Sequence, residues 1–237
     1  PLFTAAYTGV NGGLVILAAD DPGMFSSQNE QDSRYYAMAS MVPIMEPADS
    51  AEAHRFAKDA YDISEQFDTP VMMRSTVRIS HTKTPVEVGE RTEVAKRPYK
   101  KDCAKWVMMP AFAKPRRKVL VERISKIREW VETCPYNTIE RNTPEGSNKR
   151  IGIICAGAVY QHVKEACPDA DIFKLGVSWP LPAKALNEFA NSVDELHVVE
   201  EASTYLSDAV KATGVILDSF QMPLPADGEI PPADILR

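Results

Sequence analysis

Short apolar runs rich in valine and isoleucine alternate with stretches of helical periodicity along most of this chain, and this alternation constrains its fold most. The runs occupy residues 14–19, 42–45, 71–77, 151–155, 172–177, 196–199 and 215–217. A run that is apolar at every position, such as LVILAA at 14–19, is typical of a strand buried on both faces. Because strands separated by helices need crossover connections, the sheets are predicted to be mainly parallel.

The clearest helix is predicted over residues 49–68. Asp49 is a good N-cap, and Glu52 stands three residues later, close to a capping box. The apolar residues of this stretch recur at the spacing of one helical face: Ala53, Phe56, Ala57, Ala60, Ile63 and Phe67. Further helices are predicted over residues 33–41, 119–133, 159–166, 183–193 and 205–212.

The alternation is interrupted between residues 80 and 118, which hold four prolines and little periodicity. Between Lys96 and Lys118 there are nine Lys or Arg residues and one acid, Asp102, in a chain whose net charge is −6. This basic connector is predicted to lie along an acidic surface, with a grip on phosphate groups as the alternative. The predicted layout is one α/β unit over residues 1–80, a connector with one helix over 81–149, and a second unit over 150–237.

Charge, hydropathy and cysteine content argue against several classes of protein. A net charge of −6 and a pI of about 5.3 argue against nucleic acid as a partner, and no run approaches the roughly 18 apolar residues of a membrane helix. The four cysteines form no C-x-x-C pair and no signal peptide is seen, so we expect a cytoplasmic protein with reduced thiols and no metal site. The chain opens at Pro1 in a loop-like sequence, and we expect it to be a piece of a longer protein.

The densest polar cluster, DDPGMFSSQNEQD at residues 20–32, directly follows the first apolar run. Ligands of open α/β sheets collect at the carboxyl ends of the strands. This loop is therefore a candidate lining of an active site. A solvated loop that caps the next helix is the alternative.

Three weaker features each have a structural interpretation as well as a functional one. The glycines of TGVNGG at 8–13 precede a strand rather than a helix, which favours a turn over a phosphate cradle. Glu200 and Glu201 follow a strand and form either an acid–base pair or, more commonly, a helix cap or an interface contact. Of the four histidines, His81 alone is a candidate neighbour of a site.

Several strings give the chain a specific resemblance. The first is GLVILAADDPGMFSSQNEQDSRYYA, with MVPIMEPADSAEA and DTPVMMRSTVRISH after it. IGIICAGAVYQHVKE, KLGVSWPLP and ELHVVEEAS follow in the second unit. Together they resemble thiamine-diphosphate-dependent 2-oxoacid:ferredoxin oxidoreductases, in particular the alpha subunit of indolepyruvate ferredoxin oxidoreductase. The resemblance covers the chain except the connector, and Phe25 stands where the family commonly has histidine.

The resemblance implies an α/β fold with two mainly parallel-sheet domains. These are a partial pyrimidine-binding domain of the thiamine enzymes and a transketolase C-terminal-like domain. It implies oxidative decarboxylation of aryl pyruvates to aryl-acetyl-CoA, with electrons passed to ferredoxin. Thiamine diphosphate, Mg²⁺ and iron–sulfur clusters would belong to the full-length enzyme. The beta subunit, ferredoxin, CoA and a 2-oxoacid would be its partners, in an oligomer.

By the same resemblance, the family's activating glutamate lies upstream of this segment, and its metal–diphosphate motif and cluster cysteines lie downstream. We therefore expect no catalytic residue, no metal ligand and no bound cofactor in this segment, which alone would be inactive. The residues expected beside cofactor or substrate are Gln28, Asn29, Glu30, Gln31 and Asp32. The alternative is a noncatalytic α/β assembly or binding module related to these enzymes.

Overall fold

Two four-stranded sheets form the framework of the chain in a computed structural model, which describes residues 1–91, 93–95, 98, 100–219, 224–225 and 227–235. The first sheet has the order β1 (Val15–Asp20), β3 (Val71–Thr76), β2 (Ile44–Met45), β7 (Val177–Trp179). The second has the order β4 (Thr138–Glu140), β6 (Asp171–Leu175), β5 (Ile151–Ala156), β8 (Glu195–Val199). Only the pairs β2–β7 and β4–β6 are antiparallel among the described strands, which confirms the predicted α/β class with mainly parallel sheets.

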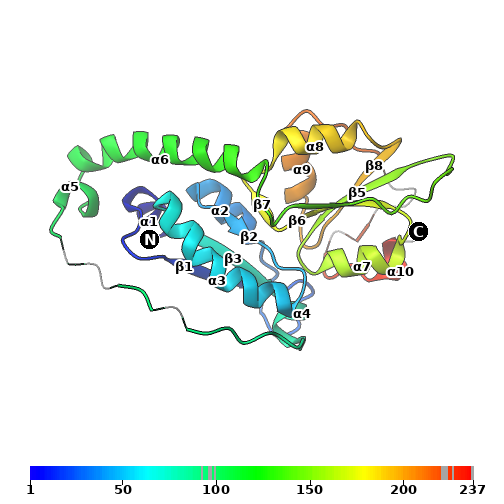
Figure 1. Ribbon diagram of the computed structural model, residues 1–237, viewed down its shortest axis with the longest axis horizontal. Coiled ribbons are helices and arrows are strands. Elements are labelled where there is room, and N and C mark those ends of the chain that lie inside the picture. Colours follow the sequence, from blue (N-terminus) through cyan, green and yellow to red (C-terminus); the bar gives the residue numbers. More distant parts are fainter. Residues whose placement is uncertain (92, 96–97, 99, 220–223, 226, 236–237) are drawn as a thin grey trace.

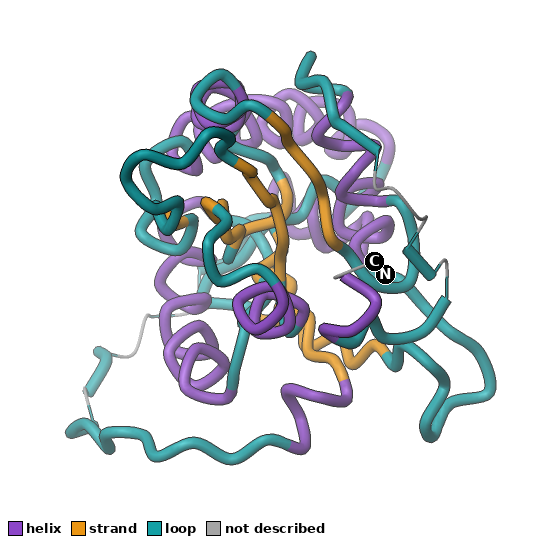
Figure 2. Tube along the Cα trace, turned by 90° about the vertical axis from the view of Figure 1, so that its right-hand side faces the viewer, coloured by secondary structure: helices purple, strands orange, loops and turns teal. Residues whose placement is uncertain are grey.

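Helices cover both sheets, which lie side by side in Figure 1. Those of the first half are α1 (Leu2–Thr8), α2 (Arg34–Ser40), α3 (Ser50–Phe67), α4 (Val77–His81), α5 (Cys103–Trp106) and α6 (Pro110–Val131). Those of the second half are α7 (Val159–Ala166), α8 (Ala183–Ala190), α9 (Tyr205–Lys211) and α10 (Pro232–Ile235). Figure 2 shows helices around most of the strands, while the described parts of the segment between α4 and α5 run as loop outside them.

Helix α3 forms as its capping signal predicts. Asp49 Oδ1 accepts a hydrogen bond from the Glu52 N–H at 2.8 Å, and Glu52 Oε2 accepts one from the Ala48 N–H at 2.9 Å. These bonds satisfy N–H groups that have no partner inside a helix. Phe56 and Ile63 are buried on the apolar face of α3, which packs against β3 and β1.

The prediction that the first run is buried on both faces is wrong. Strand β1 lies at the edge of its sheet, where Leu17 is 62% exposed and Ala19 is also exposed. An edge strand covered on one face and a central strand covered on two can have the same apolar composition. Composition alone therefore could not distinguish them.

The connector contains more structure than predicted. Helix α6 begins at Pro110 rather than at 119, because a proline at the first helical position costs no hydrogen bond. Pro115 lies inside this helix, and the segment 81–149, predicted to hold one helix, also contains α5 and β4. The strand predicted at 215–217 is absent from the described residues, and the chain there pairs with β8 mainly through Asp218, whose N–H donates to the Leu196 carbonyl at 2.8 Å.

Two basic residues of the connector, Lys105 and Arg116, contact a single acid, Asp68, rather than the predicted acidic surface, and they cap the end of α1. Lys105 donates to the Val10 carbonyl at 2.8 Å, and Arg116 donates to the carbonyls of Tyr7 and Thr8 at 2.9 Å. The carbonyl end of a helix carries partial negative charge. Lys105 and Arg116 neutralise this charge and also pair with the carboxylate of Asp68. Lys96 and Arg97, counted in the basic stretch, lie outside the described residues.

The two sheets are separate, as predicted, but they are not separately packed. Strand β7, from the second half, pairs with β2 of the first sheet, and one buried apolar cluster includes Phe56 and Phe173 from opposite halves. The chain turns from β6 to β7 at Gly176, where an added Cβ would lie 2.4 Å from the Tyr136 carbonyl oxygen. The domain boundaries at 80/81 and 149/150 stay a prediction.

None of the helices within the described ranges combines the length and the apolar character that crossing a bilayer requires.

Candidate functional site

The polar loop of residues 21–33 leaves the carboxyl end of β1, the edge of the sheet where the sequence placed it. Its two ends are fastened to each other by Asp20, the last residue of the strand. Asp20 accepts hydrogen bonds from the Ser33 N–H at 2.9 Å and from the Ser33 hydroxyl at 2.6 Å. The loop is thus closed at its base by a buried carboxylate.

A second carboxylate shapes the turn inside the loop. Asp21 Oδ2 accepts hydrogen bonds from the N–H groups of Ser26 at 2.8 Å and Ser27 at 3.0 Å. The bond from Ser26 is the main reason that the pKa of Asp21 is lowered, since a carboxylate is stabilised by each donor aimed at it. The DPG turn is therefore held from within rather than left as a mobile tip.

Beneath the loop, Arg74 connects three strands of the first sheet. Arg74 is 5% exposed, and its guanidinium contacts Asp20 on β1 at 2.5 Å and Glu46 beyond β2 at 2.8 Å. Glu46 in turn accepts a hydrogen bond from the Ser178 hydroxyl of β7. Burial opposes the charge of Arg74, but the carboxylate of Glu46, followed by that of Asp20, raises the pKa of its guanidinium.

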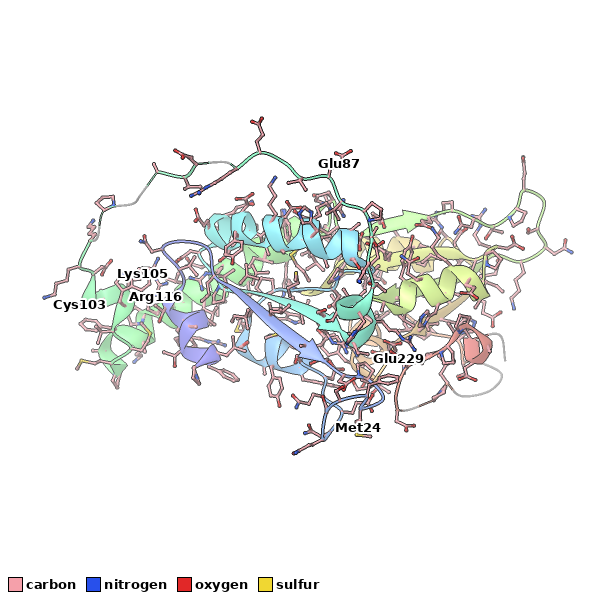
Figure 3. The ribbon with its side chains drawn as sticks, turned by 90° about the horizontal axis from the view of Figure 1, so that it is seen from below. Met24, Glu87, Cys103, Lys105, Arg116 and Glu229 are labelled. Atoms are coloured by element: carbon pink, nitrogen blue, oxygen red, sulfur yellow. The ribbon has the colours of Figure 1, made fainter. Side chains whose placement is uncertain are left out.

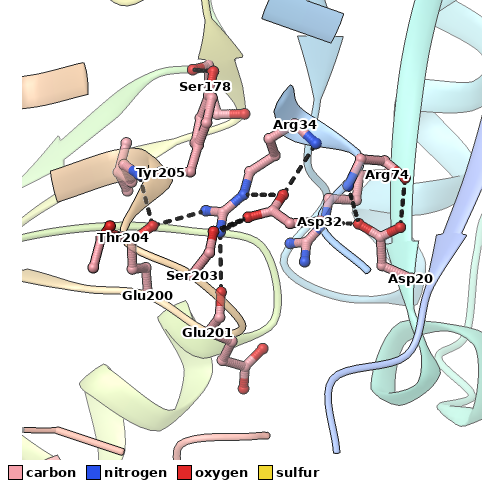
Figure 4. Close-up of polar contacts among 12 residues, drawn as sticks. Asp20, Asp32, Arg34, Arg74, Ser178, Glu200, Glu201, Ser203, Thr204 and Tyr205 are labelled. Atoms are coloured by element: carbon pink, nitrogen blue, oxygen red, sulfur yellow. Dashed lines mark hydrogen bonds and ion pairs between the residues drawn. The ribbon is translucent and has the colours of Figure 1, made fainter. Parts of the chain in front are cut away.

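Arg34 links the loop to the second sheet (Figure 4). Its guanidinium is bidentate to Asp32, at 2.8 and 2.7 Å, and lies 3.2 Å from Glu200. It also donates to the Glu201 carbonyl at 3.0 Å and stacks 4.8 Å from the Tyr205 ring centroid. Burial is the largest single effect on Asp32 and opposes its ionisation, yet the hydrogen bond and charge of Arg34, together with Arg74 and Ser203, outweigh it and lower the pKa of this carboxyl.

Of the two interpretations of Glu200, the structure supports the helix cap. Its carboxylate accepts hydrogen bonds from the N–H groups of Leu206 at 2.6 Å and Ser207 at 2.7 Å, at the start of α9. Burial raises the pKa of Glu200 and of Glu201, against the opposing effect of neighbouring donors. The Ser203 hydroxyl donates to Asp32, so the segment after β8 is tied directly to the loop.

The predicted site residues divide into two groups. Gln28, Asn29 and Gln31 are exposed on the loop, and Gln31 Nε2 donates to Asn29 Oδ1 at 3.1 Å. Glu30 and Asp32 are partly buried; the Glu30 carboxylate accepts the Gly23 N–H of the same loop, and the Asp32 carboxylate accepts the Ser203 hydroxyl from outside it. The loop thus presents amide groups outward and uses its acids for its own support.

The other candidates lie elsewhere. In TGVNGG, the N–H groups of Val10 and Gly13 donate to the side chains of Asp68 and Glu65, as in a turn, which leaves neither free for a phosphate. His81 is exposed at the end of α4. The sequence analysis missed Arg34 and Arg74; the available signal was a single arginine within the otherwise uncharged strand VMMRST.

The described residues offer no set of three or more His, Cys, Asp or Glu side chains suited to a metal ion. A metal–diphosphate group needs hard oxygen ligands that converge on one point. The carboxylates of this region are instead paired with Arg34 and Arg74. The residues present therefore do not fit such a group.

Comparisons with known proteins give a consistent result, although no model of a known protein family matches the chain. Subunit IorA of indolepyruvate oxidoreductase from Methanothermobacter marburgensis is 38% identical over 214 residues, which cover 88% of this chain and 34% of that subunit. IorA from Pyrococcus horikoshii is 39% identical over 219 residues, covering 88% of this chain and 33% of its own length. IorA from Archaeoglobus fulgidus is 35% identical over 221 residues, covering 91% and 35%.

Among solved structures, 2-oxoglutarate:ferredoxin oxidoreductase from Magnetococcus marinus matches with a TM-score of 0.67. The match covers 99% of this chain and 49% of that one, at 14% identity, and so speaks for a shared fold. The chain spans about a third of the length of the curated relatives. Over about nine tenths of its own length, the chain is therefore similar to the IorA subunits of indolepyruvate oxidoreductases.

Proposed function

We propose that the chain is part of an oxidoreductase that oxidatively decarboxylates aryl pyruvates of the indolepyruvate type to aryl-acetyl-CoA and passes the electrons to ferredoxin. The identity to IorA subunits supports the reaction class, and the loop of residues 21–33 supports a place for this segment within it. In this proposal the beta subunit, ferredoxin, CoA and the 2-oxoacid are its partners.

One observation carries the assignment of the loop. Buried ion pairs fix it at both ends, while its outward amides at Gln28, Asn29 and Gln31 remain exposed. Ordering a polar loop costs conformational entropy, and a solvated loop needs no such support. A rigid base under exposed amides is the arrangement of a binding surface, where donors must be held in position before the ligand arrives.

The chemistry of these residues suits the substrate side of such a site. An amide offers both an N–H donor and a carbonyl acceptor, so Gln28 and Gln31 can hydrogen-bond to the carboxylate and the keto oxygen of a 2-oxoacid. Thiamine diphosphate with Mg²⁺ would supply the electron sink for decarboxylation, and iron–sulfur clusters the electron exit. Those groups would be held by other parts of the full-length enzyme, since the residues described here do not fit them.

Substitutions in the complete oxidoreductase test the loop. A hydrogen bond contributes about 0.5–1.5 kcal/mol, so Gln28→Ala and Gln31→Ala should each lower kcat/KM by about 2- to 12-fold. The melting temperature should stay within about 2 °C, because both side chains are exposed. Gln66→Ala, an exposed glutamine on α3, is the matched control and should change neither quantity.

Two results would contradict the proposal. Unchanged kinetics with a melting temperature several degrees lower would mean that the loop is purely structural. The isolated chain should not bind thiamine diphosphate tightly, and calorimetry that found micromolar, Mg²⁺-dependent binding would contradict the assignment of that cofactor to other parts of the enzyme.

A further inference from the structure

A short segment near the end of the described chain, residues 228–230, lies against the candidate loop although about 200 positions separate them; we call it the strap. The Gly228 N–H donates to Glu30 Oε1 at 3.0 Å, and the same oxygen accepts the Gly23 N–H at 3.2 Å. One carboxylate oxygen thereby joins the DPG turn, the middle of the loop and the strap. Figure 3 shows Met24 of the loop and Glu229 of the strap on the same side of the molecule.

The strap is itself anchored in the second half of the chain. Ile230 is fully buried in an apolar cluster with residues of β5 and α7. Its N–H donates to Glu201 Oε1 at 3.3 Å, and its carbonyl lies 2.7 Å from His162 Nδ1. Because the strap is fixed to the second half of the chain, it can hold the loop in one position. A strap without these contacts would instead move with the loop.

A third attachment comes from the helix that follows β3. Arg78 contacts both carboxylate oxygens of Glu229, with Nε at 2.8 and 2.7 Å, and its guanidinium lies 5.8 Å from the Phe25 ring centroid. Arg78 is 57% exposed while Glu229 is only 10% exposed, so the acid end of this pair is sheltered. The single ion pair is worth little by itself, but it fixes the strap next to the loop.

The two turns that meet here approach closely. Gly23 and Gly228 both have positive φ values, +84° and +79°, and a Cβ on Gly228 would lie 3.7 Å from the Gly23 Cα. Glycine is the residue suited to such backbone conformations. The loop and the strap thus contact each other through their backbones, and the Glu30 carboxylate bridges the two.

We infer that Glu30 is a positioning residue and that the strap sets the conformation in which the loop presents its amides. This inference rests on the proposed function, and it gives Glu30 a role distinct from that of Gln28 or Gln31. The engaged oxygen of Glu30 serves two backbone N–H groups, so its carboxylate acts on the loop rather than on a substrate. An acceptor oxygen is what this role requires, and the negative charge is not.

The test compares E30A with E30Q, because glutamine keeps the acceptor oxygen and loses the charge. In the complete oxidoreductase, E30A should speed amide hydrogen exchange of residues 22–32 by about tenfold, since two hydrogen bonds are lost. It should lower kcat/KM while leaving the global melting temperature within about 2 °C. E30Q should restore both the exchange protection and the kinetics to near the wild-type values.

A matched control removes a similar carboxylate at the opposite end of β1. Glu65 Oε1 accepts the Gly13 N–H at 3.0 Å, so E65A should leave exchange of residues 22–32 and turnover unchanged. Unaltered exchange in E30A would overturn the inference. So would E30Q kinetics as poor as those of E30A with intact protection, since Glu30 would then act at the substrate. Faster exchange in E30A with turnover intact in both E30A and Gln28→Ala would support the strap's hold on the loop and overturn the proposed function.

Discussion

Replacement of Arg34 by methionine should destabilise the protein by about 3–5 kcal/mol, the usual cost of breaking a buried ion pair from one side. Methionine keeps the apolar stem over Tyr205 but leaves Asp32 and Glu200 without their cation. The lost contacts are 2.7 and 3.2 Å long, and all three side chains are at most 8% exposed. For a chain of this size the expected fall in melting temperature is roughly 6–20 °C.

The dependence of this loss on pH follows from Asp32. In the wild type the pKa of Asp32 is lowered. The ionised Asp32 therefore stabilises the fold fully at pH values above the pKa of an ordinary aspartate, and this stabilisation is lost as the pH falls through the lowered pKa. In the variant the arginine is gone, the pKa of Asp32 rises and a proton can relieve the unpaired charge. The difference in urea midpoint between Arg34→Met and wild type should therefore narrow from pH 7 to pH 5.

The control for this measurement is Arg55→Met. Arg55 is 54% exposed and lies 3.4 Å from Glu52, so its pair is worth at most about 1 kcal/mol. If Arg34→Met cost no more than Arg55→Met at pH 7, the network would not hold the loop. A difference in urea midpoint between Arg34→Met and wild type that widened from pH 7 to pH 5 would equally refute this explanation.

Two further outcomes are expected from other parts of the fold. Hydrogen bonds from Thr143, Arg141 and Asn142 together outweigh the effect of burial and lower the pKa of Asp171. In urea titrations below about pH 4, the wild type should therefore lose stability more steeply with falling pH than Asp171→Asn. Gly176→Ala should cost about 1–3 kcal/mol, because its Cβ would lie 2.4 Å from a carbonyl oxygen; a melting curve equal to that of Gly89→Ala, where nothing lies within 4 Å, would contradict this.

Local signals in the sequence located the elements that local interactions determine. Helix α7 has the predicted bounds of 159–166, and the N-cap of α3 is Asp49, because capping and apolar spacing are encoded within a few residues. Strand β7 could not be separated from β6 in one apolar run, since its partner β2 lies more than 130 residues earlier. The start of α6 was misplaced because a proline can begin a helix as well as break one.

The candidate loop was predictable in position but not in its supports. A polar stretch after an apolar strand is visible in the sequence, and the structure places it at the carboxyl edge. The partners of Arg34 come from residues 32 and 200, and those of Arg74 from residues 20 and 46. Asp32 is only two residues from Arg34, but the pairings with residues 20, 46 and 200 join segments far apart in the sequence and depend on the tertiary fold, which composition and periodicity do not specify.

The contacts that hold the loop come from both halves of the chain. Asp20 and Arg74 fix its base to the first sheet, while Arg34 reaches Glu200 after β8 and Glu30 reaches the strap. A loop fastened to a single sheet would keep its conformation if the other sheet moved. Because this one is fastened to both, a displacement of the sheets relative to each other must strain it or release one set of contacts. The conformation of the exposed amides therefore reports on the fit between the two halves, and substitutions at that junction should affect the loop without touching it.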